Sequence, residues 1–557
     1  MTLKSTLSLS VMTGFLLLIG CSGADTYEIA PVDAIWLTEQ IEAEKLERQN
    51  KDSRLEALQN LDLAEPGLFS WDEKNETGQN VEFINLELPD DGGEIGKLVL
   101  SGLHMKEGSP LYTSLQIEDA VFTAYQGQEF ARLKKARLNF SPELNTHILN
   151  NIGFVGIEEI WDDLSYLNWE PLMSGGAYMD GLKMDLGDMS VELGFMGWMP
   201  EDEADHVSLV MKDVAILPEG TFADPDGLKF TLDHISMSGF DNFGTDSNDY
   251  FDWNTFNVFD PGYESLIVEN LELGFDSFFF KVPKVEAGLV GEPGGIYQNQ
   301  TVMKNVTIGF EDEPFSYELD YLWQLFGQMG FDVLNMDYEA RINLDAEQDS
   351  ASVDMFDVSF NEDFKLSADF DVQGYLAFVN AITDLNKSRQ NISAQNFSET
   401  LDNVKAAEDK YALERDNLKL NFLDVTFVEN GGLDEFFTNM AASQEVSEDV
   451  ARQQFKAYAM MMTLGIKEEF QSALAEDFAI SAQSFVTQGG ALKFTIRPDE
   501  EFDLGQALKE YSQYNAADLE ALEESKSQIR EITEDEPKTL RDIFGAMNIN
   551  FEHVETK

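Results

Sequence analysis

The chain has 557 residues, of which 43% are apolar, and its 104 acidic residues outnumber 37 lysines and arginines to give a formal net charge of -67 at pH 7. Such a surface repels the phosphates of nucleic acids, so the composition excludes nucleic acid as a partner. The apolar content is enough for the cores of about two to four domains, and a single cysteine excludes disulfides within the chain.

The first twenty residues have the pattern of an export signal. A positive start at Lys4 precedes an apolar segment at 7–19, which is too short to span a bilayer comfortably. Its end, Leu18-Ile19-Gly20-Cys21, resembles the lipobox of bacterial lipoproteins. The resemblance implies that residues 1–20 are removed and that Cys21 carries diacylglycerol and an acylated amino group, with chains such as palmitate. In that family Ser22 after the cysteine favours the outer membrane. The alternative is an ordinary signal peptide with an incidental cysteine.

Residues 21–80 are predicted to form an anchor and a helical stalk. Leu37 and Ile41 stand four residues apart in a segment from Asp33 to about Leu63 that is otherwise rich in charge, which is typical of a helix with one apolar face. We interpret it as a stalk or docking helix between the lipid and the body, closed by a turn-rich stretch before Val81.

Residues 81–375 carry a recurring strand pattern. In "LIVENLEL" two apolar residues two apart precede a turn-forming residue, and two more apolar residues follow it. A bulge at the turn-forming residue would correct the register and keep the flanking apolar side chains on one face. We therefore predict that Leu266, Val268, Leu271 and Leu273 share one face, as do Met303, Val306 and Ile308. The turn-forming positions are Gly102, Asp119, Asp188, Asp213, His234, Asn270, Asn305, Asp357 and Asp424. The alternative is an ordinary large antiparallel sheet without a repeat.

Such a series of strands, in an exported chain that closes on helices, resembles the AsmA-like and YdgA-like envelope proteins of Gram-negative bacteria. The resemblance spans about Val81 to Phe360, with a last copy at Asp424. It implies an elongated, curved sheet, and some members are implicated in moving or sorting lipids. This chain departs from the membrane-embedded members by using a lipid anchor.

The rest of the chain is predicted to be richer in helix. Residues 376–416 read as a helical excursion, and 417–512 as strand, two helices, strand and helix, with Ser447 as the N-cap of the second helix. Residues 513–557 form an acidic amphipathic tail. The fold class is therefore α+β: an elongated, mostly antiparallel sheet of degenerate repeats, with helices at the N-terminus and in the C-terminal third.

Catalytic motifs are absent from the sequence. We find no nucleophile elbow, P-loop or dinucleotide fingerprint, and the five histidines lack the spacing of metal ligands. The acidic loop at 241–252 offers Asp241, Asp246, Asp249 and Asp252 to calcium, but it lacks the glycine of an EF-hand, so a solvated loop is the simpler interpretation. We therefore predict a non-enzymatic protein with no cofactor and no metal site.

Two clusters are candidate binding sites. Phe275, Phe278, Phe279 and Phe280 crowd one strand, so both faces of that strand are covered or one face meets a lipid-like ligand. Arg132, Lys134, Lys135 and Arg137 form a basic island that is either the outer face of a strand or a site for an anionic partner.

These observations predict a lipid-anchored envelope protein of the outer membrane that faces the periplasm. It would bind or transfer lipid in a β-groove, which requires a continuous apolar strip along the sheet. One alternative is a scaffold that binds other envelope components, and another is a hydrolase without recognised motifs.

Overall fold

The computed structural model describes residues 32–43, 69–139, 175–200, 207–218, 227–240, 264–314, 317–443, 446–457, 473–498, 502–503 and 549–554, with short gaps inside some of these ranges. Cys21 and the loop with Asp241, Asp246, Asp249 and Asp252 lie outside the described residues.

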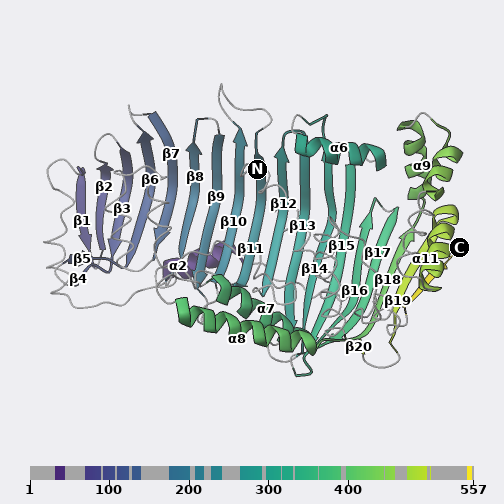
Figure 1. Cartoon of the computed structure of the whole chain (residues 1–557). Helices are drawn as coiled ribbons and strands as arrows, with labels where there is room; N and C mark the ends of the chain where they lie inside the picture. The colour runs from purple at the N-terminus through teal and green to yellow at the C-terminus, as the bar shows by residue number, and fades with distance from the viewer. Residues whose placement is uncertain are drawn as a thin grey trace.

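One 19-stranded antiparallel sheet dominates the molecule (Figure 1). Almost every strand pairs with the next along the chain, so the sheet is a long meander and the predicted fold class is confirmed. Its strands are β1 Glu73–Thr77, β2 Asn80–Glu87, β3 Gly93–Ser101, β6 Ser114–Ala124, β7 Gln128–Leu138, β8 Ala177–Asp185, β9 Met189–Pro200, β10 Val207–Pro218, β11 Lys229–Phe240, β12 Ser265–Phe275, β13 Phe278–Gly291, β14 Ile296–Phe310, β15 Val333–Asp345, β16 Ser350–Phe360, β17 Phe364–Gln373, β18 Lys419–Glu429, β19 Gly490–Ile496, β20 Phe502–Asp503 and β21 Ile549–Val554. A separate hairpin contains β4 His104–Lys106 and β5 Ser109–Leu111.

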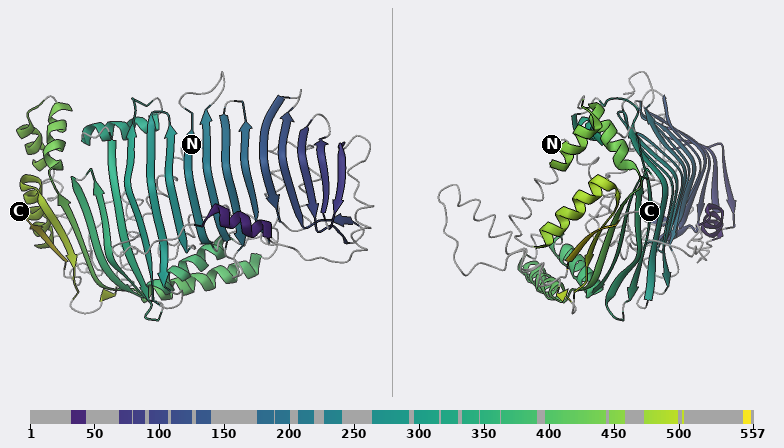
Figure 2. Two further views of the ribbon diagram at one scale, coloured as in Figure 1. Left: turned by 180° about the vertical axis from the view of Figure 1, so that it is seen from behind. Right: turned by 90° about the vertical axis from the view of Figure 1, so that its right-hand side faces the viewer.

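The helices lie on the two faces of the sheet (Figure 2). One face, here called the α2 face, carries α2 Ala34–Ala43. The opposite face, here called the α6 face, carries the others: α6 Tyr317–Met329, α7 Tyr375–Gln390, α8 Phe397–Asp416, α9 Gly432–Ser443 and α11 Ala473–Gln488.

In every strand of the sheet from β2 to β14, two residues three positions apart point to the same face, which interrupts the regular alternation of side chains. We call such an interruption a three-residue step. In β12, Val268 and Leu271 belong to the same core cluster although an odd step would send them to opposite faces of a regular strand. The equivalent pairs are Phe83/Leu86, Ile95/Leu98, Ile117/Ala120, Leu133/Ala136, Met179/Leu182, Leu193/Met196, Met211/Val214, Leu232/Ile235, Val282/Val285 and Met303/Val306.

Every second one of these strands takes the step through a residue with positive φ. Asn270 has a φ of 51° and Asn305 one of 56°. The full set is Asn85, Asp119, Gly181, Asp213, Asn270 and Asn305, in β2, β6, β8, β10, β12 and β14. Asn, Asp and Gly are the residues that adopt this conformation at least cost.

The intervening strands place a matching residue at the same level. Asn270 lies between the pairs Glu269/Lys284 and Leu271/Val282, so Pro283 faces it. The other facing residues are Gly96, Lys134, Gly194 and Asp233. A Cβ atom added to Gly194 would stand 2.7 Å from the Cβ of Asp213, so the absence of a side chain there makes room for the neighbouring step.

The central expectation of the repeat is confirmed. Leu266, Val268 and Leu271 pack in one cluster, and so do Met303, Val306 and Ile308, whereas Leu273 is only half-buried. The expected extra residue is present in β14, where the register against β15 shifts between Met303 and Val306. It is absent at Asn270, because β13 makes the same step and keeps the register.

The structure differs from the prediction at other turn-forming positions. In β11 the residue that faces Asn270 is Asp233, not the predicted His234. Gly102 has positive φ, but it follows the end of β3. Asp188 lies outside the described residues. In β16 and β18 the unpaired residues are Asp354 and Asn421 rather than the predicted Asp357 and Asp424.

The predicted segmentation also changes. Helix α6 was not expected within 81–375, and β18 and β19 extend the main sheet rather than form a separate region at 417–512. Strand β21 pairs with β19, so the segment 513–557 is not wholly an amphipathic tail. Helices α7 and α8 lie in the segment predicted as a helical excursion, 376–416, and residues 448–457 are helical directly after Ser447, as predicted.

We expect the positive φ at Asn270 to be the costly element of the step. Asn270→Val should lower the free energy of unfolding by about 1–2 kcal/mol, because a β-branched residue is strained there. Asn270→Gly should cost less than about 1 kcal/mol, although both variants lose the 2.7 Å hydrogen bond to Asp233. Urea denaturation measures both, and equal losses would show that the hydrogen bond, not the backbone, is decisive.

Candidate functional site

The apolar residues on either side of the three-residue steps form one continuous row on the α6 face. Two core clusters account for it, and half-buried Met179 and Leu182 of β8 pack against both. The row therefore runs from β2 to β17, about 60 Å at about 4.8 Å per strand. Its centre is fully buried at Val282 and Val306, and half-buried methionines such as Met196 and Met211 flank it.

Helices border this row at both ends of the strands. Figure 1 shows α6 along one end of the central strands and α7 and α8 along the other. Phe326 of α6 stacks edge-on against Phe310 at 5.7 Å, and Tyr375 and Leu376 at the start of α7 pack against the row.

The phenylalanine cluster divides between the two faces. Phe280 packs against the row, Phe278 stacks against Phe310 at 5.4 Å, and Phe275 pairs with Phe278 across the hairpin. Phe279 faces the other way, where the Lys281 ammonium lies 5.6 Å from its ring centroid. Both faces of this strand thus carry aromatic side chains, and three of the four point to the α6 face.

On the opposite face, α2 fits a surface that two glycines leave open. Leu37 and Ile41 are fully buried among Tyr178, Val210 and Phe195. A Cβ added to Gly197 would lie 2.5 Å from Cδ2 of Leu37, and one added to Gly176 would lie 3.1 Å from Cγ1 of Ile41. The predicted docking helix is therefore seated on the sheet over the ten residues described.

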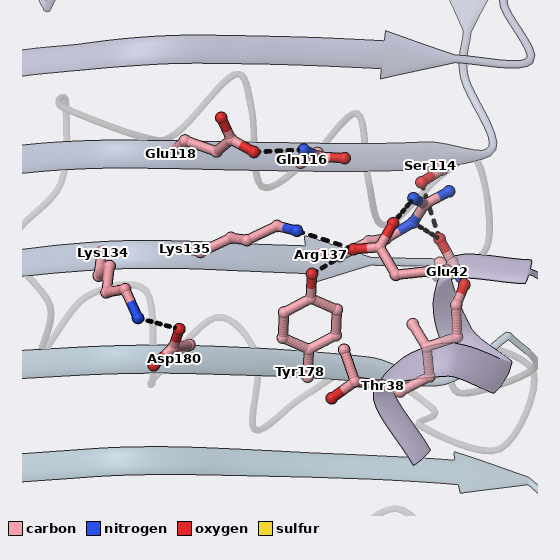
Figure 3. A network of polar contacts seen from close by, with 12 residues as sticks. Thr38, Glu42, Ser114, Gln116, Glu118, Lys134, Lys135, Arg137, Tyr178 and Asp180 are labelled. Atoms are coloured by element: carbon pink, nitrogen blue, oxygen red, sulfur yellow. Dashed lines mark hydrogen bonds and ion pairs between the residues drawn. The ribbon is translucent and has the colours of Figure 1, made fainter. Parts of the chain in front are cut away.

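A polar latch fastens the C-terminal end of α2 (Figure 3). The Glu42 carboxylate accepts hydrogen bonds from Lys135 at 3.0 Å, from Arg137 at 2.5 Å and from the Tyr178 hydroxyl. Asn139, which is 1% exposed, donates to the carbonyl of Ile41 at 2.9 Å and accepts from Ser114 at 2.7 Å. We call Glu42, Lys135, Arg137, Tyr178 and Asn139 the α2 latch.

Partial burial makes the latch electrostatically strong. Burial alone would raise the pKa of Glu42, but hydrogen bonds from Tyr178 and Lys135 and the attraction of Arg137 lower it. Burial and the hydrogen bond to Glu42 raise the pKa of Tyr178 to about 12. Burial opposes the charge on Lys135, yet its hydrogen bonds with Tyr178 and Glu42 raise its pKa. The latch therefore holds a charged carboxylate and a neutral phenol at neutral pH.

The basic island finds its anions within the chain. Lys135 and Arg137 bind Glu42, Lys134 binds Asp180 at 2.6 Å, and Arg132 binds Glu129 at 2.9 Å. Sequence reasoning grouped the four cations but missed Glu42 and Tyr178. Both are far from β7 along the chain, and no local pattern marks them.

Neither a metal site nor a membrane-spanning helix occurs in the described ranges. No group of three or more His, Cys, Asp or Glu side chains there is arranged to hold a metal ion. None of the helices described is both long and apolar enough to cross a bilayer.

We expect the α2 latch to respond to pH through Glu42. Because its folded pKa is lowered, its stabilisation is fully present above the ordinary glutamate pKa, about 4.3, and is lost as pH falls through the folded value. Glu42→Gln should speed hydrogen exchange of α2 at pH 7 by about tenfold, roughly the strength of one hydrogen bond to a charged group, and should remove the acid-dependent loss.

Glu39→Gln is the matched control, because Glu39 is exposed on the same helix. Hydrogen exchange of residues 34–43, corrected for the intrinsic rate at each pH, measures both variants. Equal behaviour of the two would mean that Glu42 does not hold α2.

Comparison with protein families finds a match in the C-terminal part of the chain. A family model described as "Uncharacterized protein" matches residues 357–523, which begin in β16 and extend beyond β20. No curated protein matches the chain.

Proposed function

We propose that this protein is a lipid-anchored, non-enzymatic envelope protein of the outer membrane, facing the periplasm, that binds acyl chains of lipids along the apolar row. The observation that carries the proposal is the continuity of the row over the α6 face from β2 to β17. A continuous apolar strip along the sheet is what the binding of an extended acyl chain requires.

The chemistry of the row suits an extended hydrocarbon. Its members are aliphatic, methionine or aromatic side chains, and burial of each CH2 group of a ligand against them contributes about 0.8 kcal/mol. Methionines such as Met179, Met196 and Met211 adapt their shape to ligands of different form. Half-buried side chains, rather than the fully buried centre, are the surface that a chain would reach first.

The α2 latch gives the proposed anchor a mechanical role. Asp33 lies twelve positions after Cys21 in the sequence, a reach of at most about 40 Å. Lipidation of Cys21 would therefore hold the sheet close to the leaflet, with α2 as the fixed point of attachment.

A scaffold that binds other envelope proteins is a second candidate. One observation favours it: Ile35 and Trp36 of α2 are 67% and 46% exposed, although both are large and apolar. The scaffold hypothesis predicts no saturable binding of an acyl probe to the purified protein.

Substitution of Cys21 tests the anchor. Cys21→Ser should abolish incorporation of labelled palmitate and release the protein from the membrane fraction, because several acyl chains are needed for durable attachment. Radiolabelling and fractionation of expressing cells measure both effects. A Cys21→Ser protein that stays in the membrane fraction would contradict the anchor.

A charge placed in the row tests lipid binding. Met211→Glu should weaken binding of a fluorescent C16 fatty acid by at least about tenfold, because the carboxylate would lose water on contact with the acyl chain. Thr231→Glu adds the same charge to the α2 face, since Phe230 and Leu232 on either side of it belong to the row, and should bind like the wild type. Titration of fluorescence measures all three, and equal losses in both variants would refute binding at the row.

A further inference from the structure

Arginines in this protein regularly bind carboxylates of the same chain. Five of the six whose side chains are described do so: Arg132 with Glu129, Arg137 with Glu42, Arg415 with Asp416, Arg452 with Glu448 and Asp434, and Arg497 with Asp424. With 104 acidic residues against 37 basic ones, such pairing is the expected state of a cation.

Arg341 is the exception among these six. It lies in β15 between Ala340 and Ile342, which both belong to the apolar row, so its own side chain is on the α2 face. Its Nε and Nη2 atoms are buried and make no hydrogen bond. Two buried donors without a partner are costly, because each has lost water and gained no hydrogen bond in return.

The two unused donors form one edge of the guanidinium. Arg132 uses the same edge, Nε at 3.0 Å and Nη2 at 2.9 Å, to bind the two oxygens of Glu129. Arg415 directs these atoms to Asp416 at 3.1 and 2.8 Å. This edge is the part of arginine that matches two oxygens of a carboxylate or phosphate, so Arg341 presents an empty fork of the kind that this chain elsewhere fills with an oxyanion.

Three acids on the α2 face near Arg341 are already paired with lysines. Glu339 binds Lys304 at 2.8 Å, Glu286 binds Lys284 at 2.6 Å, and Asp357 binds Lys365 at 2.7 Å. These three pairs leave the Nε and Nη2 atoms of Arg341 without a partner.

The residues paired with Arg341 on the two neighbouring strands are neutral. Gln300 and Met355 stand directly opposite it on the two neighbouring strands. Asn343, two residues along the same face, uses its Oδ1 to accept from Gln298 at 2.5 Å, which leaves its amide N–H groups as further donors. Movement of the flexible Met355 side chain is the simplest way to open the site to a small anion.

We propose that Arg341 is the centre of a binding site for an oxyanion, a phosphate or carboxylate group held by Nε and Nη2, with the Asn343 amide as a neutral second donor. The site is on the face opposite the apolar row and does not depend on acyl-chain binding there. Its ligand is small or carries its anionic group at a narrow end, because the two nitrogen atoms are buried.

Thermal unfolding of the full-length protein in detergent tests the site. Inorganic phosphate should raise the melting temperature more than sodium chloride of equal ionic strength, because a ligand that binds only the folded state stabilises it. Arg341→Met should abolish this difference and, without phosphate, be at least as stable as the wild type, since it removes an unpaired buried charge. Arg132→Met, at an exposed and already paired arginine, should keep the difference.

Calorimetry with phosphate and with acetate gives the affinity directly. Arg341→Met should weaken whichever anion binds by at least about tenfold, and Arg132→Met should not. The proposal is overturned if neither anion binds the wild type, or if Arg341→Met binds as tightly as the wild type. A soluble short-chain phosphatidic acid that displaces phosphate would identify a lipid headgroup as the source of the anion, whereas phosphate binding without displacement would identify free phosphate.

Discussion

The strict two-residue alternation of side chains in a β-strand is the constraint on which this structure depends. Once β2 takes an odd step at Asn85, β3 must take one at the same level or lose its register. Each following strand must likewise take a step to keep its register with the strand before it. The series of steps ends in β14, where an extra residue shifts the register against β15. There the backbone N–H of Asn305 donates to Asp337 at 2.6 Å, and β15 returns to regular alternation from Met336 to Leu344.

The step itself has two forms because antiparallel neighbours meet it from opposite directions. One form needs positive φ and uses Asn, Asp or Gly, at a cost of about 1–2 kcal/mol for any other residue. In the other form φ is not positive: Gly194 and Pro283 take this position in β9 and β13, and Lys134 and Asp233 take it in β7 and β11. Of the two residues that face each other at a step, only one therefore has positive φ.

Sequence reasoning found four residues of the first form, Asp119, Asp213, Asn270 and Asn305, and missed Asn85, Gly181 and the residues of the second form. Asn270 and Asn305 were predictable because a turn-forming residue stands between apolar pairs, and "VEFINLEL" at Asn85 and "AYMDGLKM" at Gly181 carry the same spacing. In β7 the two residues inside the step are lysines, which are not turn-forming residues and therefore gave no signal. In β11 the residue that faces Asn270 is Asp233, one position before the predicted His234. The α2 latch had no such pattern, because Glu42 reaches Lys135 and Tyr178 across 93 and 136 residues. Arg341 alternates with apolar residues like any polar residue of a regular strand, so the sequence does not show that two of its donors lack a partner.

The same steps that keep the apolar row continuous also deliver the α2 latch to the other face. In β7, regular alternation from Leu133 would place Lys135 and Arg137 on the α6 face, whereas the step turns both toward Glu42. In β9 the step after Leu193 turns Phe195 away from the row, so that it stacks with Tyr178 at 6.1 Å beneath α2. Continuity of the row and seating of the helix are therefore two results of one backbone feature, and a loss of register in β7 would disrupt both faces at once.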